Sequence, residues 1–408
     1  MKLKFKYRRY VLVAGIAVSL VVLLTHCINN ETKNKADAES DGRKFENYAG
    51  SEKCASCHKS IYDQYVHTAH YLTSQPAEKK FIKGSFSKDS NNFSYTPFLL
   101  LSMQKRDSGF YQVVYFRNDE KMAMKFDIVI GSGVMGQSYL TRRGDRLFQM
   151  PITYFTAAHQ WSNSPGFPTD KVMTDRPVTS RCLECHATFA QGEGGTEMEP
   201  VSFPKDKMIL AVGCEKCHGP GEQHVKYQAE HPADKTAKFI INPASLSRQQ
   251  QLDACAVCHG GKIQKTKPSF SFTAGKNLED YFTTNTINQA AMSSGEVEVH
   301  GNQYGLLQAS KCFIQSNLTC NTCHGTHANE RGNMALFSER CMSCHNVNSS
   351  GFKTPTHRST ANITQNCVDC HMPQQASKAI AVYLQGRTEP VASLIRSHYI
   401  AVYNNKKR

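Results

Sequence analysis

One pattern recurs seven times in this chain and constrains its fold more than any other feature. Two cysteines are separated by two residues and followed directly by a histidine, as CASCH (54–58), CLECH (182–186), CEKCH (214–218), CAVCH (255–259), CNTCH (320–324), CMSCH (341–345) and CVDCH (367–371). The copies use 14 of the 16 cysteines, whereas histidine makes up only 17 of 408 residues. Chance would seldom place histidine after every pair, so it belongs to the motif.

A cysteine pair can form three kinds of site, and the histidine that follows it distinguishes between them. A zinc ribbon uses two pairs as four ligands and places no demand on the next residue. A redox dithiol needs no adjacent histidine either, and it occurs once rather than seven times. The C-x-x-C-H run is typical of covalent haem c attachment, in which two thiols bond to the porphyrin and the imidazole binds the iron. The sequence therefore predicts seven haem c groups.

The predicted attachment residues and proximal iron ligands follow directly from the motifs. The thioether cysteines are Cys54, Cys57, Cys182, Cys185, Cys214, Cys217, Cys255, Cys258, Cys320, Cys323, Cys341, Cys344, Cys367 and Cys370. The proximal histidines are His58, His186, His218, His259, His324, His345 and His371.

Nine further histidines compete for the second axial position of each iron. The candidates that we favour as distal ligands are His70, His224, His327, His357, His398, His300 and His159. His327 lies only three residues after His324, so it cannot reach the far face of its own haem but can serve a neighbour. His67 is the alternative to His70, and His231 is the weakest candidate because Pro232 holds it extended. Methionine ligands remain open.

The first 27 residues are predicted to be a signal peptide. A basic start is followed by an apolar run at 11–24, which is shorter than the roughly 20 residues of a membrane span. LTHC, ending at Cys27, resembles a bacterial lipoprotein signal whose cysteine is lipidated, although His26 stands where a small residue is usual. An uncleaved signal anchor is the alternative. Residues 28–44 are polar and predict a flexible tether. We expect export to the periplasm or outer surface, with membrane tethering.

Residues 93–165 contain no motif and follow a different pattern. The stretch 121–130, KMAMKFDIVI, alternates apolar and polar residues, which is typical of a half-buried strand. FYQVVYFR at 110–117 precedes it across an Asn-Asp turn, and a second hairpin is predicted around the Gly-Asp pair at 144–145. We expect a small antiparallel insertion that packs against the haem core. The alternative is a docking surface or substrate gate with an anion-facing patch of Arg142, Arg143 and Arg146.

Composition limits the possible partners and the kind of core. The formal net charge of +14 would suit nucleic acid, but no basic stretch beyond the first ten residues is long or interleaved with aromatics. Counted with glycine and without tyrosine, about 42% of residues are apolar, below the usual 45–50% or so. We expect haem to fill the core, its propionates to offset the charge, and redox proteins rather than nucleic acid as partners. The unpaired Cys312 is expected to be a buried small residue, with a reactive thiol as the alternative.

Several blocks of sequence carry a family resemblance. CHGPGEQHV, LTCNTCHGTH and NCVDCHMP resemble the multihaem cytochromes of the cytochrome c-554 and hydroxylamine oxidoreductase-like superfamily. EKCASCHKSIYDQYVHTAH is similar to that family's first haem segment, and the resemblance puts His70 at the distal position. It implies helical haem segments, stacked haems and mainly bis-histidine ligation. Related nitrite and tetrathionate reductases mark the active haem with lysine in place of the motif histidine, and no motif here ends in lysine.

Together these features predict a mostly α and loop, cofactor-cored multihaem cytochrome c with a small antiparallel β insertion. The expected organisation is a signal peptide (1–27), a tether (28–44), a first haem segment (45–92), the insertion (93–165) and a six-haem helical domain (166–408). The expected function is electron transfer between a membrane quinol or cytochrome donor and a terminal acceptor. The alternative is a reductase of a small nitrogen or sulfur oxyanion with one five-coordinate haem. No catalytic residue is assigned, and His159 is only a weak candidate.

Overall fold

The computed structural model describes residues 43–194, 201–283, 297–345 and 364–403. The described residues from 45 onward form one compact unit. The predicted signal peptide, Cys27, most of the tether and the candidate ligand His357 lie outside the described residues. Within the described ranges, none of the helices combines the length and apolar character that a membrane crossing needs.

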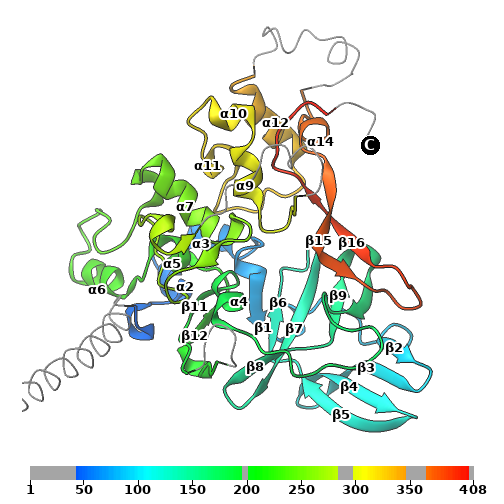
Figure 1. The fold of residues 1–408 in the computed structure, drawn as a ribbon. Helices are drawn as coiled ribbons and strands as arrows, with labels where there is room; N and C mark the ends of the chain where they lie inside the picture. Colours follow the sequence, from blue (N-terminus) through cyan, green and yellow to red (C-terminus); the bar gives the residue numbers. More distant parts are fainter. Residues whose placement is uncertain (1–42, 195–200, 284–296, 346–363, 404–408) are drawn as a thin grey trace, which may run out of the picture. The chain divides into compact units, whose positions relative to one another are not determined.

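The helices are short, and many of them carry or flank a motif (Figure 1). The α-helices are α2 (Ser51–Ala55), α3 (Lys59–Tyr65), α4 (Ser180–Glu184), α5 (Cys214–His218), α6 (Glu222–Glu230), α7 (Arg248–His259), α9 (Gln303–Gln308), α10 (Lys311–Ile314), α11 (Cys320–Cys323), α12 (Met334–Met342) and α14 (Val368–His371). Single 3₁₀ turns are η1 (Phe45–Asn47), η2 (Tyr71–Thr73), η3 (Thr156–Ala158), η4 (Lys205–Lys207), η5 (Pro243–Ser245) and η6 (Leu278–Asp280).

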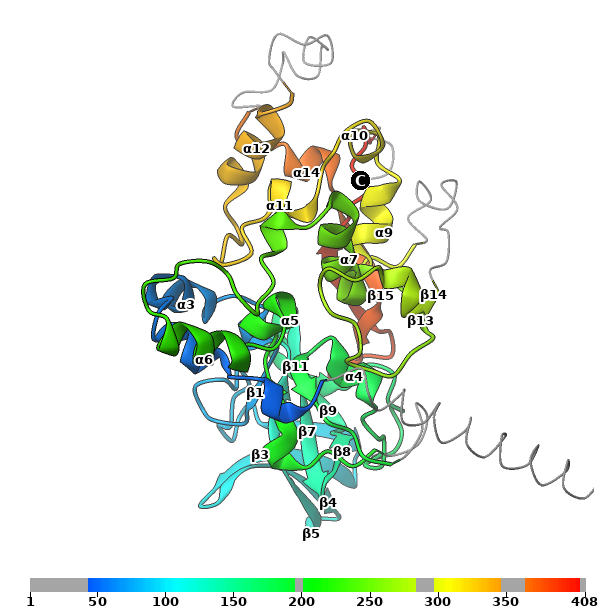
Figure 2. The same cartoon turned by 90° about the vertical axis from the view of Figure 1, so that its left-hand side faces the viewer.

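Two larger antiparallel sheets lie on the side of this unit opposite to α10, α11 and α12 (Figures 1 and 2). The six-stranded sheet contains β1 (Ser74–Pro76), β6 (Ile128–Ile130), β7 (Gly136–Arg143), β8 (Arg146–Gln149), β9 (Ile152–Phe155) and β10 (Gln160–Asn163). The four-stranded sheet contains β2 (Asn92–Thr96), β3 (Leu99–Arg106), β4 (Gly109–Phe116) and β5 (Asp119–Lys125) in that order.

Three two-stranded sheets lie in the motif-rich part of the chain. They pair β11 (Ala187–Ala190) with β12 (Met208–Leu210), β13 (Gln264–Lys265) with β14 (Phe282–Thr283), and β15 (Gln374–Val382) with β16 (Val391–Arg396). The long hairpin β15–β16 extends from the last motif back toward the six-stranded sheet, where Tyr383 donates its amide to Asn163 at 2.8 Å.

Both predicted hairpins are present, but the predicted single strand at 121–130 is wrong. Strand β4 pairs with β5, and β7 pairs with β8 around the turn at 144–145. The pairing of β5 with β4 ends at Lys125, and Asp127 then donates its amide to the carbonyl of Leu140 in β7, at 2.9 Å. The chain therefore leaves one sheet and enters the other as β6. Met122 is accordingly 43% exposed although Met124 is buried.

Apolar side chains of both sheets form a shared core around the only tryptophan of the chain. Trp161 packs against Phe86, Phe126, Tyr139 and Tyr154 and donates its indole hydrogen to a backbone carbonyl at 2.7 Å. Gly84 permits this arrangement, since a β-carbon there would lie 2.0 Å from the indole ring. Protein side chains thus pack the core of this part of the chain.

The structure does not clearly bear out the expectation of a mostly α fold. Helix and strand are nearly equal, at 27% and 26%. The reason is that a C-x-x-C-H motif needs only one helical turn to bring its residues together, so seven motifs do not require seven long helices. Even α7 has only 12 residues.

Candidate haem sites

Each motif occupies about one turn of helix. In four of them the amide of the histidine donates to the carbonyl of the first cysteine: His58 to Cys54 (2.8 Å), His324 to Cys320 (3.0 Å), His345 to Cys341 (2.9 Å) and His371 to Cys367 (3.1 Å). Residues i and i+3 lie on the same side of a helix. Both thiols of a motif therefore face the same way, as two bonds to one porphyrin require. None of the 15 cysteines that the structure describes forms a disulfide.

Four motif histidines are also oriented by a hydrogen bond at Nδ1. These bonds join His186 to the Thr73 hydroxyl (2.9 Å), His218 to the Ile241 carbonyl (2.8 Å), His259 to the Gln303 side-chain oxygen (2.8 Å) and His371 to the Ala401 carbonyl (2.9 Å). In the three bonds to a carbonyl oxygen, the oxygen can only accept, so Nδ1 of His218, His259 and His371 carries the hydrogen and Nε2 keeps its lone pair. A metal-binding histidine is usually held in this way by its second nitrogen.

Three motif histidines face a histidine from another segment. Ring centres are 6.1 Å apart for His218 and His327, 6.2 Å for His324 and His398, and 6.1 Å for His259 and His70. Two imidazoles on opposite sides of one metal ion, with metal–nitrogen bonds of about 2 Å, have ring centres roughly 6 Å apart. The spacing of these pairs therefore fits an iron between the two rings. The ring planes differ, with angles of 16°, 28° and 67° respectively.

The electrostatics of these histidines also suit metal binding. The side chain of His70 keeps exposed surface, but desolvation and, to a smaller extent, His259 and His324 together lower its pKa to about 4. Desolvation likewise lowers the pKa of His398 to about 4, with His324 adding to the effect. For His186, desolvation and then the charge of His300 lower the pKa to about 4. Neutral imidazole is the form that binds a metal.

The remaining candidates stand in different environments. His224 in α6 has its Nδ1 2.8 Å from the Lys238 carbonyl, the arrangement seen for the motif histidines. His231 stacks on the ring of Tyr227 and also contacts its carbonyl. His159 is exposed in a left-handed conformation (φ 52°) at the end of η3. His67 is exposed as well. Burial raises the pKa of the Cys312 thiol, as in an inert residue.

Glu215, inside the third motif, ties that motif to the first. Its buried carboxylate accepts the amides of Ala49 and Gly50, which precede the first motif, at 2.8 and 2.9 Å, and that of Gly221 at 2.7 Å. The hydroxyl of Ser51 accepts the amide of Cys214 at 3.4 Å. Sequence analysis missed Glu215, whose only signal was an acidic residue within a motif.

Comparable contacts join other motifs. The guanidinium of Arg340, just before the sixth motif, donates to the carbonyl of Cys323 in the fifth at 2.7 Å and pairs with Glu330 at 2.6 Å. The amide of Cys367 in the seventh motif donates to Ser338 in α12, which leads into the sixth, at 3.0 Å. Segments that are distant in sequence are thus brought into direct contact.

In the second motif, CLECH, the acidic residue is buried and neutralised. Glu184 pairs with Lys265 at 3.1 Å and Arg181 at 2.8 Å and accepts the amide of Phe270 at 2.7 Å. Burial alone would raise the pKa of Glu184, but Lys265 and the other partners hold it below its usual range. Arg181 also donates to the Val257 carbonyl in the fourth motif at 3.4 Å. The second and fourth motifs therefore lie side by side.

Two of the three arginines of the predicted anion-facing patch bind protein carbonyls. Arg142 donates to the carbonyl of Phe203 at 2.6 Å, and Arg143 donates to that of Thr174 at 2.8 Å. Arg143 also lies over the ring of Phe148. These two contacts give the arginines a structural role in joining the insertion to the motif-rich part.

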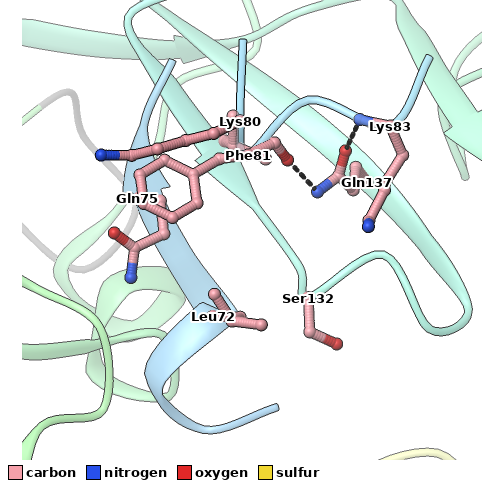
Figure 3. A pocket seen from close by; sticks show the side chains of 8 residues that line it. Leu72, Gln75, Lys80, Phe81, Lys83, Ser132 and Gln137 are labelled. Carbon is pink, nitrogen blue, oxygen red and sulfur yellow. Dashed lines mark hydrogen bonds between the residues drawn. The ribbon is translucent and has the colours of Figure 1, made fainter. Parts of the chain in front are cut away.

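A surface pocket lies at the junction of η2, β1 and β6 (Figure 3). Its lining residues are Leu72, Gln75, Lys80, Phe81, Lys83, Val129, Ser132 and Gln137. The amide of Gln137 accepts from Lys83 and donates to Phe81, both at 2.8 Å, as the dashed lines in Figure 3 show. This amide therefore organises the loop and is not available to a ligand.

Comparison with known proteins bears on two parts of the chain and on its fold. Residues 155–219, with the second and third motifs, match the family described as cytochrome c554 and c-prime. Residues 328–407, with the last two motifs, match the N-terminal region of the NapC/NirT cytochrome c family. No curated protein matches the chain.

Among solved structures, the chain is similar to the crystal structure of the outer cell wall cytochrome OcwA. The TM-score is 0.53 at 15% identity, over 87% of this chain and 79% of that one. At this identity the likeness concerns the fold alone. The family matches and the repeated motif together support a multihaem c-type cytochrome that transfers electrons.

Proposed function

We propose that this chain is an extracytoplasmic heptahaem cytochrome in which most irons carry two histidines. The observation that carries the proposal is the set of opposed imidazole pairs, each joining a motif histidine to a histidine from another segment. Haem c, when bound, would supply one-electron chemistry, and axial ligation by two imidazoles would help set its potential. An iron that has both axial positions filled has no open site for a substrate.

The proposed axial pairs are specific. The second motif would use His186 and His300, the third His218 and His327, the fourth His259 and His70, and the fifth His324 and His398. His58, His345 and His371 would serve the other three motifs, with His224, His357 and His159 as candidate partners. In three pairs the distal histidine comes from a segment next to a different motif. Each of these histidines would therefore connect the segments of two haem sites.

The role of the protein in this proposal is to hold each imidazole in place. The hydrogen bonds at Nδ1 of His186, His218, His259 and His371 would direct Nε2 toward the iron and fix the ring. The contacts between motifs, such as that of Arg340 with Cys323, would keep adjacent porphyrins close, as rapid electron exchange requires.

The proposed partners are redox proteins at the cell envelope. The NapC/NirT match supports a quinol dehydrogenase or another cytochrome as partner. The family matches, together with the likeness to an outer cell wall cytochrome, support a location outside the cytoplasm. Tethering to the membrane through Cys27 or a signal anchor remains part of the proposal.

Low-temperature EPR of the oxidised holoprotein, with a haem count by pyridine haemochrome, tests this function. We expect seven haems per chain and low-spin ferric signals throughout. A high-spin signal that changes on addition of nitrite or hydroxylamine would instead support the rival hypothesis, a reductase with one five-coordinate haem. Exported protein without covalently bound haem would contradict both.

A further inference from the structure

Tyr65 occupies a position between three of the motif segments. It is the last residue of α3, which directly follows the first motif, and it is only 7% exposed. Its hydroxyl donates to the carbonyl of Val212 at 2.5 Å. Val212 lies two residues before Cys214, the first cysteine of the third motif. A buried tyrosine of the first segment is therefore bonded to the chain that enters the third motif.

The backbone of Val212 makes a second hydrogen bond through its amide. The amide of Val212 donates to the carbonyl of His70 at 3.1 Å. His70 faces His259 of the fourth motif. Tyr65 and His70 thus both hydrogen-bond to the backbone of Val212, and we call these three residues the Val212 clamp. The clamp connects the chain before the third motif with the proposed distal ligand of the fourth.

The ring of Tyr65 makes a second contact that bears on function. It lies edge-on to the imidazole of His327, with ring centres 6.2 Å apart and an angle of 66°. His327 in turn lies 16° from parallel with His218 of the third motif. A histidine bound to a metal through Nε2 can still rotate about that bond. Packing against a neighbouring ring is therefore one way in which the protein can fix its plane.

We propose that Tyr65 is a positioning residue that sets the plane of His327, and so keeps the two axial imidazoles of the third site nearly parallel. This inference rests on the proposed bis-histidine function. The hydroxyl anchors the tyrosine ring through Val212, and the ring holds His327. The angle between axial imidazole planes affects the EPR spectrum of a low-spin ferric haem: near-parallel planes give a rhombic signal, whereas crossed planes give a signal with a larger low-field g value.

The structure contains an internal reference for this proposal. The His70–His259 pair is crossed at 67°, whereas the His218–His327 pair is at 16°. We therefore expect at least two classes of low-spin signal from the wild-type holoprotein, one rhombic and one with a larger low-field g value. The rhombic class should include the third site.

The experiment compares EPR spectra of oxidised holoproteins at equal haem content. Tyr65→Phe removes the hydroxyl and keeps the ring, and Tyr65→Leu removes both. His327→Met replaces the proposed ligand and identifies the signal of the third site by its loss. Tyr62→Phe, on the same helix, is the matched control, because Tyr62, like Tyr65, packs edge-on against Tyr71. We expect the assigned rhombic signal to shift to a larger low-field g value in both Tyr65 variants, more in Tyr65→Leu, and to stay unchanged in Tyr62→Phe.

Each outcome decides the matter. An unchanged rhombic signal in Tyr65→Leu with seven haems would overturn the proposal. Should Tyr65→Leu fail to retain its haems, Tyr65→Phe decides alone, and an unshifted signal overturns the proposal. Failure of the underlying function is recognised separately, because the wild-type protein would then lack low-spin bis-imidazole signals altogether.

Discussion

The imidazole of His327 lies opposite that of His218, with 6.1 Å between ring centres and 16° between ring planes. The two residues belong to the fifth and third motif segments, so the pair joins parts of the chain that are distant in sequence. An iron bound to His218 could therefore receive its second ligand from a loop that follows another motif.

Removing the distal imidazole should convert the third site to a different spin state. For His327→Ala we expect a haem count of seven, because attachment depends on the cysteines, together with a new high-spin ferric EPR signal from one iron. The control is His231→Ala, since His231 stacks on Tyr227. A wholly low-spin spectrum for His327→Ala would show that another group binds this iron.

The haem count can be tested one motif at a time. Replacing both Cys182 and Cys185 by serine should lower the intact mass by one haem, because no thioether bond can then form at the second motif. Cys312→Ser is the matched control and should keep the wild-type haem count, since Cys312 belongs to no motif. A lower haem count for Cys312→Ser would contradict this assignment.

Glu215 should be important for stability because its carboxylate receives three backbone amides. In Glu215→Gln only one oxygen is left to accept these hydrogen bonds, and the new side-chain NH2 group lies against backbone N–H donors. We expect a loss of about 1–3 kcal/mol in the free energy of unfolding. Denaturant unfolding of the holoprotein measures this, with Glu222→Gln, an exposed neighbour in α6, as the control. Equal stability of the two variants would contradict the prediction.

The Glu330–Arg340 pair should make stability depend on pH in the acid range. The hydrogen bonds with Arg340 lower the pKa of Glu330 to about 2, below its unfolded value of roughly 4.3. A carboxyl whose pKa is lowered by folding stabilises the protein above the unfolded pKa, and this contribution is lost as the pH falls toward 2. The stability difference between wild type and Glu330→Gln should therefore be full at pH 7 and shrink below about pH 4.3. Urea unfolding at pH 7, 4 and 3 checks this, with Glu339→Gln as the control.

Gly84→Ala should disturb the core of the β-rich part without affecting haem attachment. The new methyl group would overlap the indole of Trp161, whose ring lies 2.0 Å from the ideal β-carbon position. Overpacking of a core typically costs about 1–3 kcal/mol. We expect a lower thermal unfolding midpoint with seven haems retained. An unchanged midpoint would show that the tryptophan can move aside at little cost.

The prediction of the haem attachment residues rests on chemistry that is local. Two thiols and an imidazole within five residues form one unit, and a single helical turn suffices to arrange them. The hairpins around 118–119 and 144–145 were also predictable, because their turn residues and alternating pattern act over short distances. The extent of helix was overestimated, since the motif does not require the helix to continue beyond its own turn.

By itself, the sequence determined where the seven C-x-x-C-H motifs stand, and it led to the predictions that these residues bond to haem and that His327 serves a neighbouring iron. Only the tertiary structure decided that His327 faces His218, that His70 faces His259 and that Tyr65 holds Val212. The physical reason is that axial pairing depends on where separate segments meet. Those meetings arise from long-range contacts, such as Glu215 with the amides before the first motif, which no spacing in the sequence encodes.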